Sequence, residues 1–114
     1  MSTELAMNAY VLLGNTLHHL LSRSPAAMEE QLGAVPGALT ALNEQIEPLT
    51  PACVLAGVAE LTTPERDLLA KSVRLCLSTL SPEGVGNVLG LPLDVARETL
   101  ASLHLDEPGR PVQA

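Results

Sequence analysis

The chain has 114 residues, of which 46% are hydrophobic and 17% charged, and its formal net charge is −7. So many apolar residues exclude a wholly disordered chain, and the acidic balance argues against a protein that holds DNA phosphates by net charge. There is no Phe or Trp and a single Tyr. Leu, Ala and Val must therefore build the core, a composition that favours an all-α fold.

Helix starts are the most regular feature of the chain. A Ser or Thr before proline suits a helix N-terminus, because its hydroxyl can accept a free N–H and proline at N1 has none to lose. Four such pairs occur: Ser24-Pro25, Thr50-Pro51, Thr63-Pro64 and Ser81-Pro82. Together with apolar periodicity they predict helices over residues 3–21, 25–32, 36–46, 51–61, 64–80, 82–89 and 92–103.

These elements predict one compact all-α bundle of six to seven short helices over residues 1–105. Residues 106–114 hold two prolines and a glycine and little to bury, so we expect a flexible tail there. The long helix at 64–80 has a narrow polar stripe on an otherwise apolar surface, and we expect it at the centre of the fold.

The last two predicted helices, within residues 82–103, resemble a helix-turn-helix. Residues 81–100 read SPEGVGNVLGLPLDVARETL. Gly86 stands where a small residue lets the helices pack closely, Gly90 ends the first helix, and Leu91 fills the gap between them. Ala96 and Leu100 face inward. The segment is similar to that of bacterial helix-turn-helix regulators, and the resemblance implies that residues 92–103 would be the recognition helix.

The charges on that helix favour another use. Arg97 is its only basic residue and stands between Asp94 and Glu98, whereas a reading helix needs several donors to bases and phosphates. We therefore expect a protein rather than a nucleic acid as the partner. Under the alternative of a DNA-binding regulator, the contacts would come from four basic residues: Arg66, Lys71, Arg74 and Arg97.

Surplus apolar surface predicts a protein interface. Val11 interrupts the polar side of the first helix, and the helix at 51–61 is apolar all round. Gly14 and Gly57 lie within helices, where glycine permits close helix packing. We expect a homodimer or partner interface that includes Val11, Gly14, Val54, Gly57 and Val58.

The cysteines and histidines carry no recognisable site. Cys53 and Cys76 stand alone in apolar stretches, so we expect both to be small buried residues in a reducing cytosol. His18 and His19 are adjacent and point about 100° apart on a helix, so they cannot grip one metal, and His104 is distant.

The chain carries no pattern of an enzyme. Glu29-Glu30 is interpreted as a solvated helix turn, and no nucleophile elbow, zinc-binding or phosphate-binding motif occurs. We expect no catalytic, metal or cofactor site. No apolar run is long enough for a signal peptide or a membrane helix, which predicts a cytoplasmic protein.

These observations predict a non-enzymatic regulatory protein that acts through protein–protein interaction. We expect it to bind a second copy of itself first and then a regulator. An antiactivator or anti-sigma-like modulator of a transcription factor would suit its acidic charge and its helix pair. A DNA-binding helix-turn-helix regulator is the main alternative. A helical ligand-binding module or accessory subunit with an aliphatic pocket is the further alternative.

Overall fold

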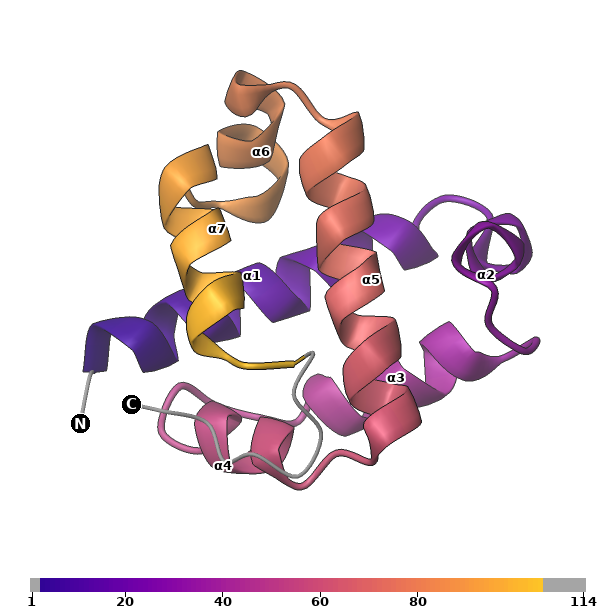
Figure 1. Ribbon diagram of the computed structural model, residues 1–114, viewed down its shortest axis with the longest axis horizontal. Coiled ribbons are helices and arrows are strands. Elements are labelled where there is room, and N and C mark those ends of the chain that lie inside the picture. Colours follow the sequence, from indigo (N-terminus) through magenta and orange to yellow (C-terminus); the bar gives the residue numbers. More distant parts are fainter. Residues whose placement is uncertain (1–2, 106–114) are drawn as a thin grey trace.

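The computed structural model describes residues 3–105, and the expected tail at 106–114 lies outside them. Within the described residues the regular structure is helical, without a strand, which confirms the all-α prediction (Figure 1). Its seven helices are α1 (Thr3–Leu21), α2 (Pro25–Leu32), α3 (Ala38–Ile46), α4 (Val54–Ala59), α5 (Thr63–Thr79), α6 (Pro82–Leu89) and α7 (Leu93–Ser102).

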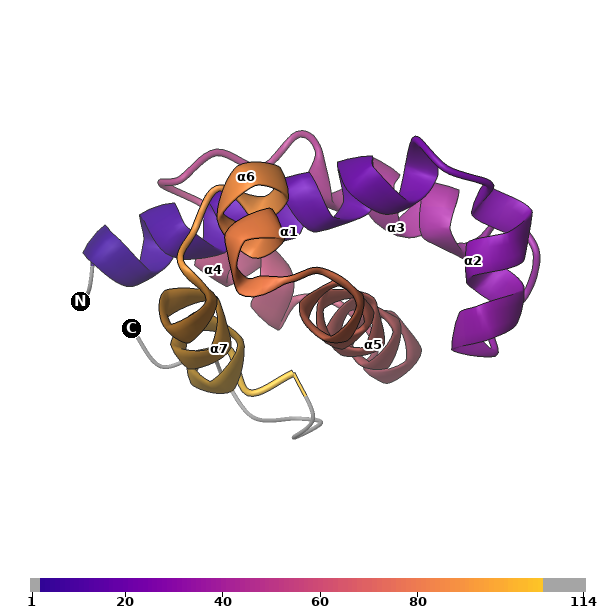
Figure 2. The same cartoon turned by 90° about the horizontal axis from the view of Figure 1, so that it is seen from above.

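The helix α1 is the centre of the fold, because it contacts each of the other six helices. One side of α1 carries fully buried Leu12, Leu13 and Leu17. Figures 1 and 2 show α5 crossing this side, with α7 next to it. The prediction that the 64–80 helix is central is therefore wrong in part: α5 is deeply buried through Leu69 and Val73, but α1 joins the elements.

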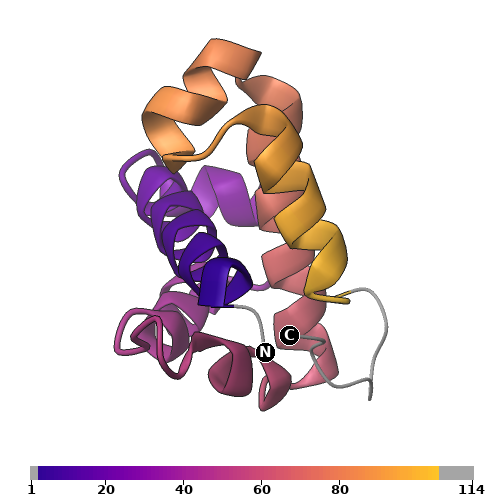
Figure 3. The same ribbon diagram turned by 90° about the vertical axis from the view of Figure 1, so that its left-hand side faces the viewer.

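The opposite side of α1 lies at the edge of the molecule. Figure 3 shows α1 at this edge, with α6 above it and α4 below it, while α5 and α7 lie on its right-hand side. Because α3, α4 and α6 flank α1 without covering it, part of its surface stays open between them.

Two of the four predicted helix caps lie at the expected residue. Ser81 caps α6, and its Oγ accepts a hydrogen bond from the backbone N–H of Gly84 at 3.0 Å. Ser24 is the N-cap of α2, although its side chain makes no capping hydrogen bond. Proline follows at the first helical position in both cases, as the pairs predicted.

The other two caps are displaced. Helix α5 is capped by Thr62 rather than Thr63, through a reciprocal pair in which Thr62 N donates to Glu65 Oε1 at 2.9 Å and Glu65 N donates to Thr62 Oγ1 at 3.3 Å. Helix α4 starts only at Val54, because residues 51–53 form turns. There the backbone N–H of Thr50 donates to Sγ of Cys53 at 3.2 Å.

The predicted surplus of apolar surface is largely absent. Among the described residues, the exposed large hydrophobic side chains are Met7, Tyr10 and Val35. Val54 and Val58, which we expected at an interface, are 1% and 0% exposed and belong to the core. Short helices hide these side chains because they pack around α1 from several directions, so one monomer buries most of its leucines.

Candidate functional site

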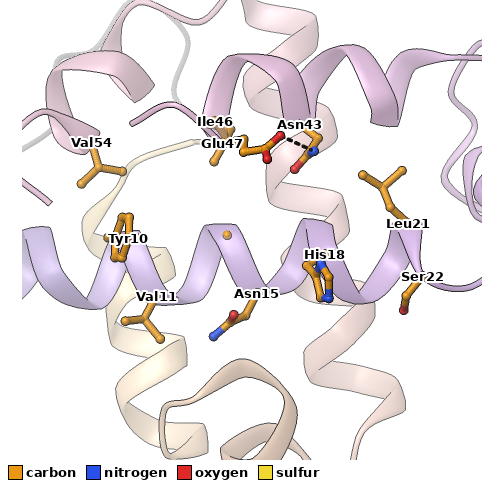
Figure 4. A pocket seen from close by; sticks show the side chains of 11 residues that line it. Tyr10, Val11, Asn15, His18, Leu21, Ser22, Asn43, Ile46, Glu47 and Val54 are labelled. Carbon is orange, nitrogen blue, oxygen red and sulfur yellow. Dashed lines mark hydrogen bonds between the residues drawn. The ribbon is translucent and has the colours of Figure 1, made fainter. Parts of the chain in front are cut away.

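The open side of α1 forms a groove of about 530 Å³ (Figure 4). Its floor comes from α1, one wall from α3 and the start of α4, and the other side ends at the turn between α6 and α7. We call it the α1 groove, and the residues that line it are Tyr10, Val11, Gly14, Asn15, His18, Leu21, Ser22, Asn43, Ile46, Glu47 and Val54.

Gly14 forms a notch in the floor of the α1 groove. A Cβ at this position would have no atom within 4 Å, so the space above the helix is open. Tyr10 and His18 are exposed and stand one helical turn before and after Gly14. The expectation that Gly14 lets another helix pack closely is not met within the described part of the chain, where no helix lies against it.

Val11 and Asn15 close the groove on the side of α6. The Nδ2 of Asn15 donates to the carbonyl oxygen of Leu89 at 3.0 Å. Gly90 adopts a φ of 80°, and a Cβ there would lie 2.9 Å from Cγ1 of Val11. Val11, which interrupts the polar side of α1, is therefore half-buried against this turn and adds only part of its surface to the groove.

The opposite wall carries the groove's acidic group. In Figure 4, Asn43 and Glu47 extend from α3 and its C-terminal end, across from Val11 and Asn15. The Nδ2 of Asn43 donates to Oε2 of Glu47 at 3.5 Å. The exposed Glu47 carboxylate is thereby held beside the groove.

The remaining interface candidates do not form a surface. Val58 is fully buried, and Val54 contributes only its edge to the α1 groove. Gly57 is covered by the side chain of Leu49, whose Cδ2 would lie 2.6 Å from a Cβ on this glycine. Of the five candidates, Val11 and Gly14 lie in the groove with exposed neighbours.

The four candidate DNA contacts are separated. Arg66 is 3% exposed, and its Nη2 donates to the carbonyl oxygen of His104 at 2.9 Å, so it is not available to a nucleic acid. Lys71 pairs with Asp67 at 2.9 Å. Lys71 and Arg74 border a hollow of about 420 Å³ between α2 and α5, whereas Arg97 lies on α7.

The helix pair resembling a helix-turn-helix has the expected bounds but not the expected packing. Gly90 ends α6 in the left-handed conformation, and Leu91 and Ala96 are buried as predicted. Gly86 does not mediate close packing, because a Cβ there would meet no atom within 4 Å. The exposed side of α7 presents Arg97 together with two acids, Asp94 and Glu98.

The two cysteines differ in exposure, although both were expected to be buried. Cys76 is buried, and burial raises the pKa of its thiol to about 11. Cys53 is exposed, so the prediction that it is buried is wrong. Hydrogen bonds with the hydroxyl and then the backbone of Thr50 lower the pKa of Cys53, because they favour its thiolate.

Glu29 is a buried structural residue, so its interpretation as part of a solvated helix turn is wrong. It is 4% exposed, and its Oε2 accepts a hydrogen bond from the backbone N–H of Leu39 at 2.9 Å. Gly37 stands at the N-cap of α3 and has no side chain to satisfy this first turn. Glu29 supplies the missing cap from α2, whereas Glu30 is exposed as expected.

His19, near the end of α1, has a lowered pKa. Burial lowers the pKa of His19, and the charges of Arg23 and His18 lower it further.

Within residues 3–105, no three His, Cys, Asp or Glu side chains gather where they could hold a metal ion. None of the described helices combines the length and apolar character needed to cross a bilayer.

The described residues thus form an all-α helical bundle with an open groove of about 530 Å³ over its central helix. Comparison with protein-family models, with curated proteins and with solved structures gives no match to this chain.

Proposed function

We propose that this chain is a non-enzymatic regulatory protein of the cytoplasm that acts by binding another protein, as an antiactivator or anti-sigma factor does. The proposed binding surface is the α1 groove. The observation that carries the proposal is the notch at Gly14, which lies open between the exposed side chains of Tyr10 and His18. Tyrosine is enriched at protein interfaces, and a glycine lets a partner's backbone approach closely.

The position of Gly14 supports a role outside folding. Glycine within a helix lowers stability by about 1 kcal/mol relative to alanine, and no atom of the described residues lies within 4 Å of where a Cβ of Gly14 would stand. The groove would therefore tolerate a side chain here as far as folding is concerned. Close approach of a partner's backbone at the notch would explain why glycine stands at this position.

The charges support a protein partner over DNA. The helix that would read DNA exposes Asp94 and Glu98 beside Arg97, and acidic side chains repel phosphates. Arg66 is buried, and the positive charge of Lys71 is paired with Asp67. A DNA-binding regulator needs several exposed cations on one surface.

The test compares two helical glycines, of which only Gly14 lines the α1 groove. Gly14 in α1 and Gly86 in α6 both lie within helices, and a Cβ at either would meet no atom within 4 Å. Gly14→Arg and Gly86→Arg therefore add the same charge and volume, but only the first fills the α1 groove. Both variants should fold, as circular dichroism will check, and thermal melts should show each to be at least as stable as the parent, because both replace a helical glycine.

Each protein is then used to capture binding proteins from the cells that express it, with quantitative mass spectrometry as the readout. We expect at least one protein that the parent and Gly86→Arg capture and that Gly14→Arg loses. Equal capture by the two variants would refute the α1 groove as the binding surface. A DNA shift by the parent that weakens steeply between about 50 and 200 mM salt would favour the DNA-binding alternative instead.

A further inference from the structure

We infer that the α1 groove binds an amphipathic helix with basic flanks, supplied by another protein. This inference rests on the proposed function and names the chemistry of the partner. It follows from two properties of the groove: its shape along α1, and the sign of the charge on its α3 wall.

The shape of the groove suits a helix. Its floor extends from Tyr10 to Ser22, which corresponds to about 18 Å, or just over three turns, along the α1 axis. Figure 4 shows the side chains of this floor arranged along the length of α1, with α3 running beside it. A helix laid in a groove contacts it through positions three and four residues apart, and the Gly14 notch would admit its closest turn.

The charge of the groove suits a basic partner. Among residues 3–105, no Lys or Arg lines it, and Glu47 is the one carboxylate in its lining. Glu44, one turn earlier on α3, is also exposed. Residues 1–62, which include α1, α3 and α4, hold six acidic residues and a single basic residue, Arg23.

The described cations lie elsewhere. Arg23 follows the end of α1 and lines no part of the groove. Its charge instead offsets part of the rise that burial causes in the pKa of the Cys76 thiol in α5. Lys71 and Arg74 border the hollow between α2 and α5, and Arg97 is on α7. The α3 wall therefore presents a negative charge to an incoming helix, with no Lys or Arg of the groove beside it.

A second copy of this chain is a poorer occupant. A two-fold interface through the α1 groove would place the same surface on both sides, so each chain would contribute its Glu47 carboxylate and no Lys or Arg of its groove to the interface. Each chain also carries a net charge of −7. Like charges brought together weaken such an interface, whereas lysine or arginine on a partner's flank strengthens it.

The test is a selection from displayed 18-residue helices. Every member has the same apolar face of Leu and Ala, and its flanking positions are drawn equally from Lys and Glu. The parent, Gly14→Arg and Gly86→Arg serve as targets. We expect peptides selected on the parent to be net basic, to bind Gly86→Arg equally, and to bind Gly14→Arg at least about tenfold more weakly. The two variants have equal net charge, so this difference reports the groove rather than general attraction to an acidic protein.

Two measurements on a selected peptide complete the test. Tyr10 is the only Tyr and the chain has no Trp, so tyrosine fluorescence reports on the groove alone when the peptide contains neither residue. Glu47→Lys should lower the affinity for the basic peptide about fivefold. The control Glu30→Lys, at an exposed site on α2, should leave this affinity unchanged. The pair Gly14→Gln and Gly86→Gln repeats the comparison without added charge.

The inference is overturned by three results. The first is a selection that yields acidic or charge-balanced peptides, and the second is binding that survives Gly14→Arg. The third is a dimer, seen by sedimentation, that Gly14→Arg dissociates, because a second copy would then occupy the groove. If cellular capture still depends on Gly14 in the first case, the proposed function stands and only the basic chemistry of the partner is wrong.

Discussion

Replacing Glu29 by alanine removes the carboxylate that caps α3 from a neighbouring helix. The Oε2 of Glu29 accepts the backbone N–H of Leu39 at 2.9 Å, and Glu29 is 4% exposed. The substitution leaves this N–H without an acceptor in a region that water does not reach readily. It also removes a negative charge from the N-terminal end of a helix, where the macrodipole favours it.

The size of the effect follows from these two losses. Hydrogen bonds to charged groups contribute about 1.5–3 kcal/mol, and the charge–dipole interaction is already included in that range. We expect Glu29→Ala to lower the free energy of unfolding by about 2 kcal/mol and the Tm by about 8 °C. Glu29→Gln keeps an oxygen acceptor and loses the charge, so it should lower the free energy of unfolding by about half as much as Glu29→Ala.

Urea unfolding and thermal melts followed by circular dichroism measure these differences. The adjacent Glu30, which is exposed on the same helix, is the matched control, and Glu30→Ala should change the stability by less than about 0.5 kcal/mol. The reasoning is refuted if Glu29→Ala and Glu30→Ala are equally stable, because the cap would then contribute nothing.

Three further results are expected from the burial and backbone of single residues. In thermal melts, Gly14→Ala should stabilise by about 0.5–1 kcal/mol, because its Cβ meets nothing, and Gly90→Ala should destabilise by about 1–2 kcal/mol, because its φ is 80°. The opposite order would contradict this. Near pH 8, iodoacetamide should modify Cys53 before Cys76 in peptide mapping, since hydrogen bonds lower the pKa of the first thiol and burial raises that of the second to about 11; equal rates would contradict the assignment. Val73→Asp should unfold the chain, because Val73 is 0% exposed, and a native circular dichroism spectrum would disprove its core position.

Local signals in the sequence located the helices well. The Ser81-Pro82 pair is a helix start because its capping bond, to Gly84, closes within three residues. The Thr50-Pro51 pair carries the same signal and fails as a helix start. There the Thr50 hydroxyl and amide contact Sγ of Cys53, and a turn precedes α4. Short-range hydrogen bonds compete at such sites, and the residue pair alone does not reveal which of them forms.

The candidate site was visible only in part. Val11 and Gly14 stood out in the sequence because each departs from the pattern of its own helix. Asn43 and Glu47 lie about thirty residues further along and had no distinguishing signal. They reach the groove because α3 packs against α1, and helix packing joins positions that no local periodicity relates.

The sequence by itself determined the all-α class, the order of the helices and the side of α1 that is buried, because these depend on residue types and their spacing along the chain. The tertiary structure alone decided which polar residues are enclosed: Glu29 and Arg66 bond backbone groups 10 and 38 residues away. It likewise decided that Val54 and Val58 are core and that Gly14 stays open. A helix pattern shows which face is apolar, but only packed neighbours determine whether that face, or a polar residue beside it, meets protein or water.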